Sequence, residues 1–203
     1  QCVWREEWDD LDFDALGDLQ SRQGVAFPMH EGAAVMNTET GELVPRAGET
    51  QGEIVLRGNA VMKGYYKDEA ATGAALHDGW FFSGDAAVWH ENGYIQIKDR
   101  LKDVIISGGE NISSVEVEGY LYRHPAVAAA AVVAKSDETW GEVPCAFVEL
   151  KPGEDVSTEE FLDWCRGQMA GFKRPKHVVF GELPKTSTGK IQKFVLRQRA
   201  NEG

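Results

Sequence analysis

An aspartate that follows a run of aromatic residues is one place where this 203-residue sequence could bind a small molecule. The segment Gly79–Asp85 reads Gly-Trp-Phe-Phe-Ser-Gly-Asp. On pattern alone, aromatic residues followed by Gly-Asp predict a core strand that ends in a turn. A carboxylate directly after a glycine at a strand end can also accept hydrogen bonds from the hydroxyls of a sugar. Asp85 is therefore a candidate binding residue.

A lysine in a threonine-rich loop is a second candidate. The segment Lys185–Lys190 reads Lys-Thr-Ser-Thr-Gly-Lys, which invites comparison with the phosphate-binding loop of nucleoside triphosphatases. That loop requires a glycine where this chain has Pro184, and a serine or threonine where it has Ile191, so the comparison fails. An isolated Thr-Gly-Lys is more often a surface loop, and a role for Lys190 needs further support.

The stretch between these candidates is a charged joint flanked by two short strands. Ile95 and Ile97 alternate with polar residues, which is typical of a half-buried strand over Tyr94–Lys98. Four charges then fall within Asp99–Asp103, a segment too polar for a core. The apolar run Val104–Ile106 favours a second strand.

A glycine pair ends the second strand. Gly108 and Gly109 let the backbone turn sharply and let another molecule approach closely. Ser113 with Glu116 three residues later forms a capping box, which predicts that a helix begins there.

The rest of the chain alternates between strand and helix patterns, so we expect an α+β protein. Beyond the joint, three or so strands should be flanked by helices. The predicted strands are Glu53–Arg57, Ala126–Ala134, Cys145–Leu150 and His177–Phe180, and the predicted helices are Asp14–Gln23, stopped by Gly24, 113–123, one that opens at Ser157, and Gln192–Asn201.

Composition excludes several classes of protein. The net charge of −12 argues against a nucleic-acid binder, and no apolar run is long enough to cross a bilayer. Cys2, Cys145 and Cys165 are odd in number and lack metal-ligand spacing, and the histidines are scattered. We therefore expect no metal site, reduced thiols and a cytoplasmic location.

The joint resembles the hinge of the adenylate-forming (AMP-dependent) acyl-CoA synthetases, in which Asp-Arg-x-Lys-Asp connects a large N-terminal domain to a small mobile C-terminal domain. The same family pattern extends, in order, through most of the chain. The matching segments are Gly52–Tyr66, Gly79–Asp85, Asp99–Ile112, Trp140–Leu150 and Leu183–Lys193.

The resemblance implies a division into residues 1–101, an incomplete end of the β-rich N-terminal domain, and residues 102–203, a mobile α+β lid, with Lys102 as the hinge. It implies that Asp85 and Arg100 bind the ribose of ATP, and that Lys190 drives adenylation. It also implies that Gly108 and Gly109 leave room for the pantetheine arm of coenzyme A.

The implied reaction joins a carboxylic acid, fatty or related, to coenzyme A in two steps with Mg·ATP. Eight basic residues against two acidic ones from Gly171 to the end suit such phosphate-rich ligands. The family's Ser/Thr/Gly-rich phosphate loop is absent from this sequence, so we expect the chain alone to be inactive.

Two alternatives stay open: an adenylation domain that loads a carrier protein, and a non-catalytic binding fragment. Trp140–Leu150 and the segment Gly108–Glu110 resemble the CoA-using branch more closely.

Overall fold

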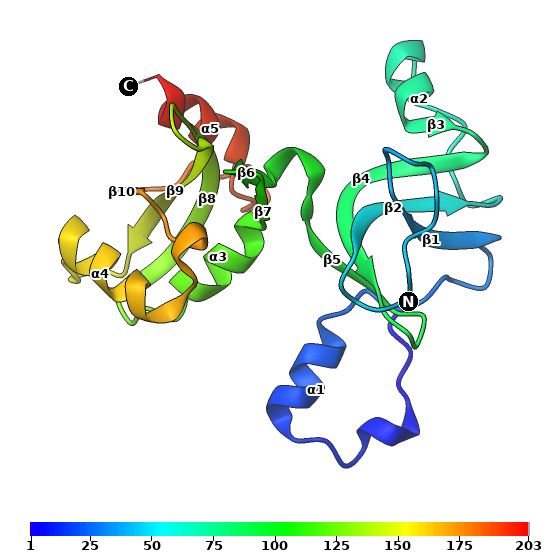
Figure 1. Ribbon diagram of the computed structural model, residues 1–203, viewed down its shortest axis with the longest axis horizontal. Coiled ribbons are helices and arrows are strands. Elements are labelled where there is room, and N and C mark those ends of the chain that lie inside the picture. The colour runs from blue at the N-terminus through cyan, green and yellow to red at the C-terminus, as the bar shows by residue number, and fades with distance from the viewer. Residues whose placement is uncertain (203) are drawn as a thin grey trace. The chain divides into compact units, whose positions relative to one another are not determined.

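The computed structural model describes residues 1–202 and divides into two compact units. Unit 1 is Gln1–Leu101, and unit 2 begins at Lys102. Each unit is built on its own five-stranded sheet (Figure 1). The α+β class predicted from the sequence is confirmed.

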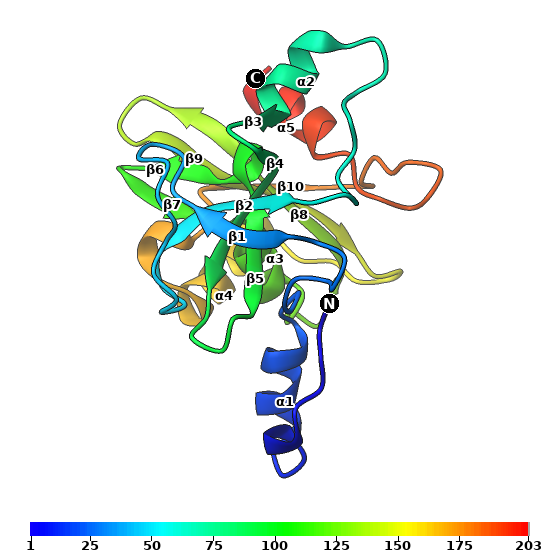
Figure 2. The ribbon, with the colours of Figure 1, turned by 90° about the vertical axis from the view of Figure 1, so that its right-hand side faces the viewer.

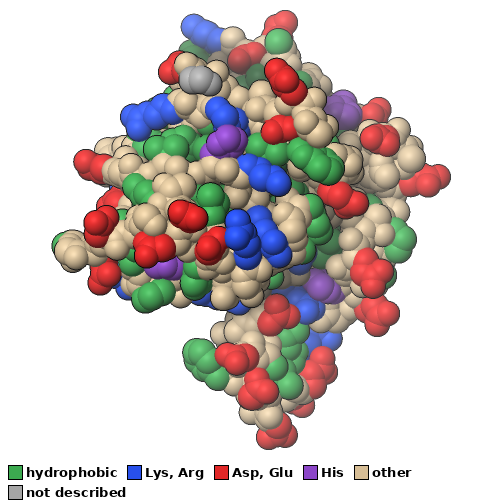
Figure 3. Space-filling model, turned by 60° about the vertical axis from the view of Figure 1, so that its left-hand side comes forward, with side chains coloured by type: hydrophobic (Ala, Val, Ile, Leu, Met, Phe, Trp, Pro, Cys, Tyr) green, Lys and Arg blue, Asp and Glu red, His purple; other side chains and the backbone are tan. Residues whose placement is uncertain are grey.

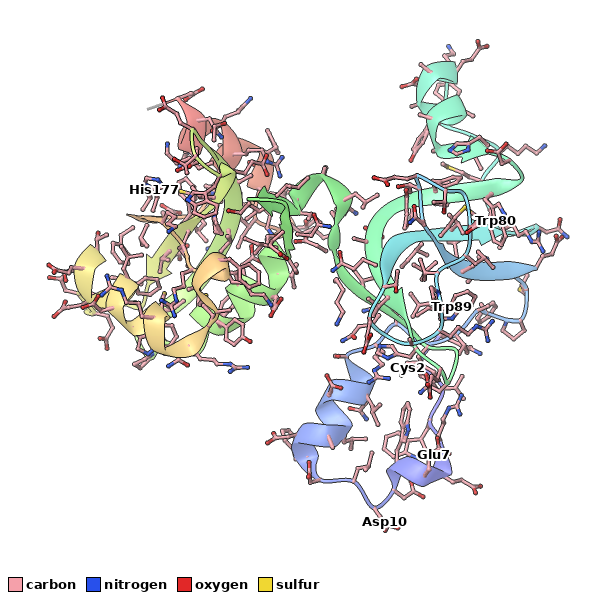
Figure 4. All side chains as sticks on the ribbon, in the orientation of Figure 1. Cys2, Glu7, Asp10, Trp80, Trp89 and His177 are labelled. Atoms are coloured by element: carbon pink, nitrogen blue, oxygen red, sulfur yellow. The ribbon has the colours of Figure 1, made fainter. Side chains whose placement is uncertain are left out.

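Unit 1 is an antiparallel sheet in the order β1-β2-β4-β3, with β5 also paired to β4. The strands are β1 (Gly32–Met36), β2 (Gln51–Arg57), β3 (Leu76–His77), β4 (Trp80–Trp89) and β5 (Ile95–Arg100), with the helices η1 (Glu6–Trp8), α1 (Phe13–Gln20) and α2 (Glu69–Ala75). Trp80 and Trp89 mark the two ends of β4 (Figure 4), and the guanidinium groups of Arg57 and Arg46 lie over their rings. Helix α1 projects away from the sheet (Figure 2).

Helix α1 ends earlier than the sequence predicts. It begins after Asp12, whose Oδ1 accepts a hydrogen bond from Ala15 N at 2.8 Å, and it ends at Gln20. Gly24 does not stop it. Gly24 instead has φ +90° and lies so close to the backbone of Gln1 that a side chain could not fit there.

The turn predicted at Asp85 is wrong, because β4 continues through this residue to Trp89. The pairing of β4 with β2 shifts register between Glu53 and Val55, so that Ser83, Gly84 and Asp85 form an irregularity inside the strand. Gly84 has φ +77°, a conformation that glycine adopts without strain. The Gly-Asp pair therefore bends a long strand without ending it.

The charged joint is also more ordered than its composition suggests. Strand β5 extends to Arg100, and Asp99 within it is only 3% exposed, so the expectation that Asp99–Asp103 is too polar for a core is wrong at this residue. The Asp99 carboxylate accepts a hydrogen bond from Arg100 N at 2.7 Å, which satisfies part of its polarity.

Unit 2 has five strands in place of the predicted three or so, because a β6–β7 hairpin joins the sheet. The elements are η2 (Leu101–Asp103), which straddles the boundary, β6 (Ile105–Ser107), β7 (Glu110–Ile112), α3 (Ser114–Leu121), β8 (Val127–Asp137), β9 (Gly141–Leu150), α4 (Thr158–Gln168), η3 (Gly171–Lys173), β10 (His177–Phe180) and α5 (Lys193–Asn201). Strand β9 pairs antiparallel with β8 and parallel with β10.

Alternate residues of β8 and β9 face two different cores. Ala130, Val132, Ala146 and Val148 pack with α3 and α4, whereas Ala131, Val133, Cys145 and Phe147 pack with α5. Helices α3 and α4 therefore cover one face of the sheet and α5 covers the other, as Figure 1 shows.

The three cysteines are unpaired in the structure, Cys2 exposed and Cys145 and Cys165 buried. Burial raises the pKa of Cys145, and it raises that of Cys165 to about 11. Among the described residues, no helix combines the length and apolar character needed to cross a membrane.

Candidate functional site

Asp85 and Arg100 lie side by side at the junction of β4 and β5. The two residues are register partners, and Arg100 Nε lies 3.4 Å from Asp85 Oδ1. The Asp85 side chain is 25% exposed and that of Arg100 is 63% exposed, so both can reach a ligand. A carboxylate acceptor beside a guanidinium donor suits neighbouring hydroxyl groups.

Glu53 is a supporting residue that the sequence analysis missed. It is 7% exposed, and its Oε1 accepts a hydrogen bond from Gly84 N at 2.7 Å. Asp85 N in turn donates to Ser83 Oγ at 3.2 Å. The irregular part of β4 is thus held from β2, which fixes where Asp85 points. The signal in the sequence is an acidic residue directly before the apolar run Ile54–Leu56.

Lys190 ends a closed turn in front of α5. Thr186 N donates to Lys190 O at 2.8 Å, and Lys190 N donates to Thr186 Oγ1 at 3.1 Å. The Lys190 side chain is exposed, and no described residue forms a hydrogen bond or an ion pair with its ammonium group. The turn therefore presents a cation that no carboxylate within residues 1–202 neutralises.

Both stems of this turn are fixed by ion pairs. On one side, Lys185 Nζ lies 2.9 Å from Glu149 Oε2, which lowers the pKa of Glu149 and raises that of Lys185. On the other side, Lys193 Nζ lies 2.7 Å from Ser114 Oγ and 2.6 Å from Glu118 Oε1, which is an ion pair with little solvent exposure. The backbone of the turn is held while the Lys190 side chain can move.

Gly108 and Gly109 form the turn of the β6–β7 hairpin, and each has a positive φ, +59° and +87°. A Cβ on Gly108 would lie 2.6 Å from the indole ring of Trp140, whereas a Cβ on Gly109 would meet open space. Gly108 is therefore needed for packing, and Gly109 leaves an open approach to the backbone.

A pocket of about 580 Å³ lies beside this hairpin. Aromatic and basic side chains line it, together with Ser107, Gly108 and Glu110. The side chains come from the turn before β9, from α4, from η3 and from the segment between η3 and β10, and they are Trp140, Arg166, Phe172, Arg174 and Lys176. Among the described residues no carboxylate lies within ion-pair distance of Arg174 or Lys176. Figure 3 shows Lys and Arg side chains next to hydrophobic ones on the forward face of the molecule.

The sequence analysis missed this pocket, which we call the aromatic–basic pocket. Its signal was the segment Phe172–Lys176, in which three basic residues follow an aromatic one. Because Trp140 is remote from that segment in sequence, only the fold shows that both line one pocket.

Within residues 1–202, no group of three or more His, Cys, Asp or Glu side chains is arranged to hold a metal ion.

Comparison with known proteins places these features in a family. Residues 116–190 match the AMP-binding enzyme C-terminal domain. The chain is 56% identical over 206 aligned positions to an acetate–CoA ligase of Humulus lupulus, and the alignment covers 99% of this chain and 36% of that protein. The chain belongs to the adenylate-forming, AMP-binding enzyme family.

Other members agree with this assignment. An acetate/butyrate–CoA ligase of Arabidopsis thaliana, described as peroxisomal, is 52% identical over 99% of this chain and 36% of its own length. The crystal structure of ATP-bound MatB from Rhodopseudomonas palustris matches with a TM-score of 0.82 and 34% identity, over 90% of this chain and 36% of that one. The chain thus spans about a third of the length of its curated relatives.

Proposed function

We propose that this chain is the C-terminal part of an ATP-dependent acid–CoA ligase. In the first step a carboxylate oxygen attacks the α-phosphorus of ATP, an acyl-adenylate forms, and pyrophosphate leaves. In the second step the sulfur of coenzyme A attacks the acyl carbon, the thiol proton passes to solvent, and AMP leaves. The observation that carries this proposal is that unit 2 presents two separate features, an exposed Lys190 turn and an aromatic–basic pocket, and we assign one to each step.

The first surface is the turn that ends in Lys190. Attack of a carboxylate on a phosphate brings two anions together, and an un-neutralised ammonium group stabilises the charge that develops and shifts toward pyrophosphate. In unit 1, Asp85 accepts hydrogen bonds from the ribose hydroxyls, and Arg100 lies beside the same sugar.

The second surface is the β6–β7 hairpin with the aromatic–basic pocket. Trp140 and Phe172 offer ring faces for the adenine of coenzyme A, and Arg174 and Lys176 offer cations for its phosphates. Gly109 leaves the pantetheine arm free to pass. The pocket is lined from α4, whereas the Lys190 turn leads into α5 on the other face of the sheet.

Because these surfaces lie on different faces of one unit, we propose that unit 2 rotates about Lys102 between the two steps. Lys102 is exposed, and no described residue forms an ion pair or a hydrogen bond with its side chain. Lys102 lies in η2, the short helix that spans the boundary between the two units, and a domain hinge usually consists of a few residues in such a connection.

Magnesium enters this proposal as the counterion of ATP. The described residues contain no carboxylate cluster that would hold the ion, so we assign it no protein ligand and no step.

For the acid we propose a small or fatty carboxylic acid. Relatives described as acetate, acetate/butyrate and 2-methylpropanoate–CoA ligases support the short end of this range. We propose a cytoplasmic location from the free thiols, while the peroxisomal relatives offer the alternative.

Titration of coenzyme A into the 203-residue protein tests the second surface directly, because the aromatic–basic pocket lies wholly within unit 2. Phe172→Ala should weaken coenzyme A about tenfold, since stacking on one aromatic ring contributes about 1–3 kcal/mol. Pantetheine, which lacks the nucleotide, should bind equally to both proteins. Tyr122→Ala removes an exposed aromatic residue outside the pocket and should change nothing.

An unchanged coenzyme A affinity in Phe172→Ala would contradict the assignment of this pocket. It would favour the carrier-protein alternative, in which no free nucleotide needs to be held.

A further inference from the structure

We propose that Arg197 is a positioning residue. By holding Asp103, it ends the flexible hinge segment directly after Lys102. Arg197 Nη2 pairs with Asp103 Oδ1, and Asp103 is the residue directly after Lys102. The inference rests on the proposed function, because a pivot matters only if unit 2 rotates. Nothing in the sequence links these two residues, which are 94 positions apart.

The chain on the unit 2 side of Lys102 is held at two nearby points. The Asp103 side chain is 11% exposed and ion-paired, which makes the pair harder for solvent to screen than a surface pair. Ile105, two residues later, is completely buried in the core beneath α3 and α4. With both points fixed, Asp103 and Val104 must move with unit 2.

The chain on the unit 1 side is held two residues before the pivot. Arg100 is the last residue of β5, is in register with Asp85 and contacts its carboxylate. Only Leu101 and Lys102 stand between the two fixed points. Both are exposed. A rotation that is confined to so few residues has a defined axis, whereas a longer free segment would let unit 2 take many orientations.

Helix α5 links the Arg197–Asp103 ion pair to the Lys190 turn. Arg197 in α5 pairs with Asp103. Lys193, four residues earlier, is the first residue of α5 after the Lys190 turn, and it contacts Ser114 and Glu118. Residues three or four apart lie on one side of a helix. The segment after the hinge and the base of the Lys190 turn are therefore tied to one rigid element, so that the rotation moves both together.

Backbone ¹⁵N relaxation on the 203-residue protein tests the role of the Arg197–Asp103 pair without any substrate. In the unaltered protein, reduced order parameters near the joint should be confined to Leu101 and Lys102. In Arg197→Met they should extend to Asp103 and Val104, with values falling from about 0.85 to below about 0.6. Arg199→Met is the matched control, because Arg199 lies on the same helix, is exposed and has no ion pair among the described residues.

Two further variants distinguish loss of the ion pair from loss of folding. The charge exchange Asp103→Arg with Arg197→Asp should restore the order of Asp103, and Arg197→Lys should retain most of it.

In a full-length parent, Arg197→Met should lower kcat of both half-reactions about tenfold with KM unchanged, because small errors in positioning reduce rate more than binding.

Three results would overturn the inference. Asp103 could stay ordered in Arg197→Met, or it could be as mobile as Lys102 in the unaltered protein. If Asp103 becomes mobile while both kcat values stay unchanged, the pair orders the backbone without positioning unit 2, and the proposed role is again wrong. Failure of the proposed function is distinguishable, since it would appear as a full-length parent that forms no acyl-adenylate at all.

Discussion

In unit 1 the two candidate ligand-binding side chains come from paired strands, whereas in unit 2 the corresponding residues come from turns. Asp85 and Arg100 face each other in register across β4 and β5. Lys190 and Gly109 lie in turns with open space around them. The difference agrees with the chemistry that we propose: the ribose is held through both steps, and each turn is needed in only one.

Lys190→Ala in a full-length parent should have the largest effect, and it tests whether the Lys190 turn acts in only one step. It should lower the rate of acyl-adenylate formation by about 10²–10³, the usual cost of removing one group that stabilises transition-state charge. Thioester formation from supplied acyl-adenylate should stay nearly unchanged, because no phosphorus is attacked in that step. Pyrophosphate exchange and single-turnover thioester assays measure the two rates, and an equal loss in both would remove the distinction between the turns.

A proline at the hinge tests whether the two surfaces must exchange places. Lys102→Pro fixes φ at the pivot and should lower thioester formation by about 10²-fold while adenylation persists. Lys102→Ala keeps the rotation and loses only the exposed charge, so both rates should stay near those of the parent. If the proline variant makes thioester normally, unit 2 does not pivot at this residue.

A side chain on the open glycine should block the second step. Gly109→Leu places a branched group in the approach to the hairpin and adds backbone strain at φ +87°, so thioester formation should fall by at least tenfold with adenylation intact. Gly153→Leu is the control, since Gly153 also has a positive φ and open surroundings but lies in the turn after β9. Equal effects of the two variants would show that strain alone is responsible.

The ribose site should respond in both steps. Asp85→Ala should weaken ATP by about 1.5 kcal/mol, near the lower end for a hydrogen bond to a charged group because the carboxylate is partly exposed. Affinity for the acyl-adenylate should fall similarly, since it carries the same sugar. Equilibrium titration of both ligands into a full-length parent measures the change, and unchanged affinities would leave Asp85 with only a structural role in β4.

The smallest expected effect is on stability, and it concerns the Lys185–Glu149 ion pair at the base of the Lys190 turn. The pKa of Glu149 is lowered by hydrogen bonds from Lys185 and from Leu183 N, so the ionised carboxylate stabilises the fold above its unfolded pKa of about 4.3. This contribution is lost as the pH falls through the lowered folded-state pKa. Thermal unfolding of the 203-residue protein between pH 3 and pH 7 should therefore show a smaller acid-induced loss in Glu149→Gln than in the unaltered protein.

Glu138→Gln is the matched control for that measurement, because Glu138 is exposed and has no partner among the described residues. A pH profile that is the same for both variants would mean that the Lys185–Glu149 pair does not hold the turn.

Local pattern was sufficient to predict most elements of unit 2. The helix starts at Ser113 and Ser157, the apolar runs of β8 and β9, and His177–Phe180 depend on neighbours within a few residues, and the structure confirms them; both hydrogen bonds of the capping box are present at Ser157, and Ser113 accepts the N-cap bond from Glu116 N. Pattern failed where the outcome depended on a partner strand. Asp85 was expected in a turn and Asp99 outside any core, because the register that places both within paired strands is set by remote residues.

The sequence by itself therefore determined which residue types are available and the order of the elements, since motif spacing and periodicity are local properties of the chain. Tertiary structure alone decided which of them meet. Trp140 and Phe172 line one pocket, Glu53 accepts a hydrogen bond from Gly84, and Arg197 pairs with Asp103. Each of these arrangements brings together residues that are far apart in the chain, and no spacing rule along the sequence encodes such a closure.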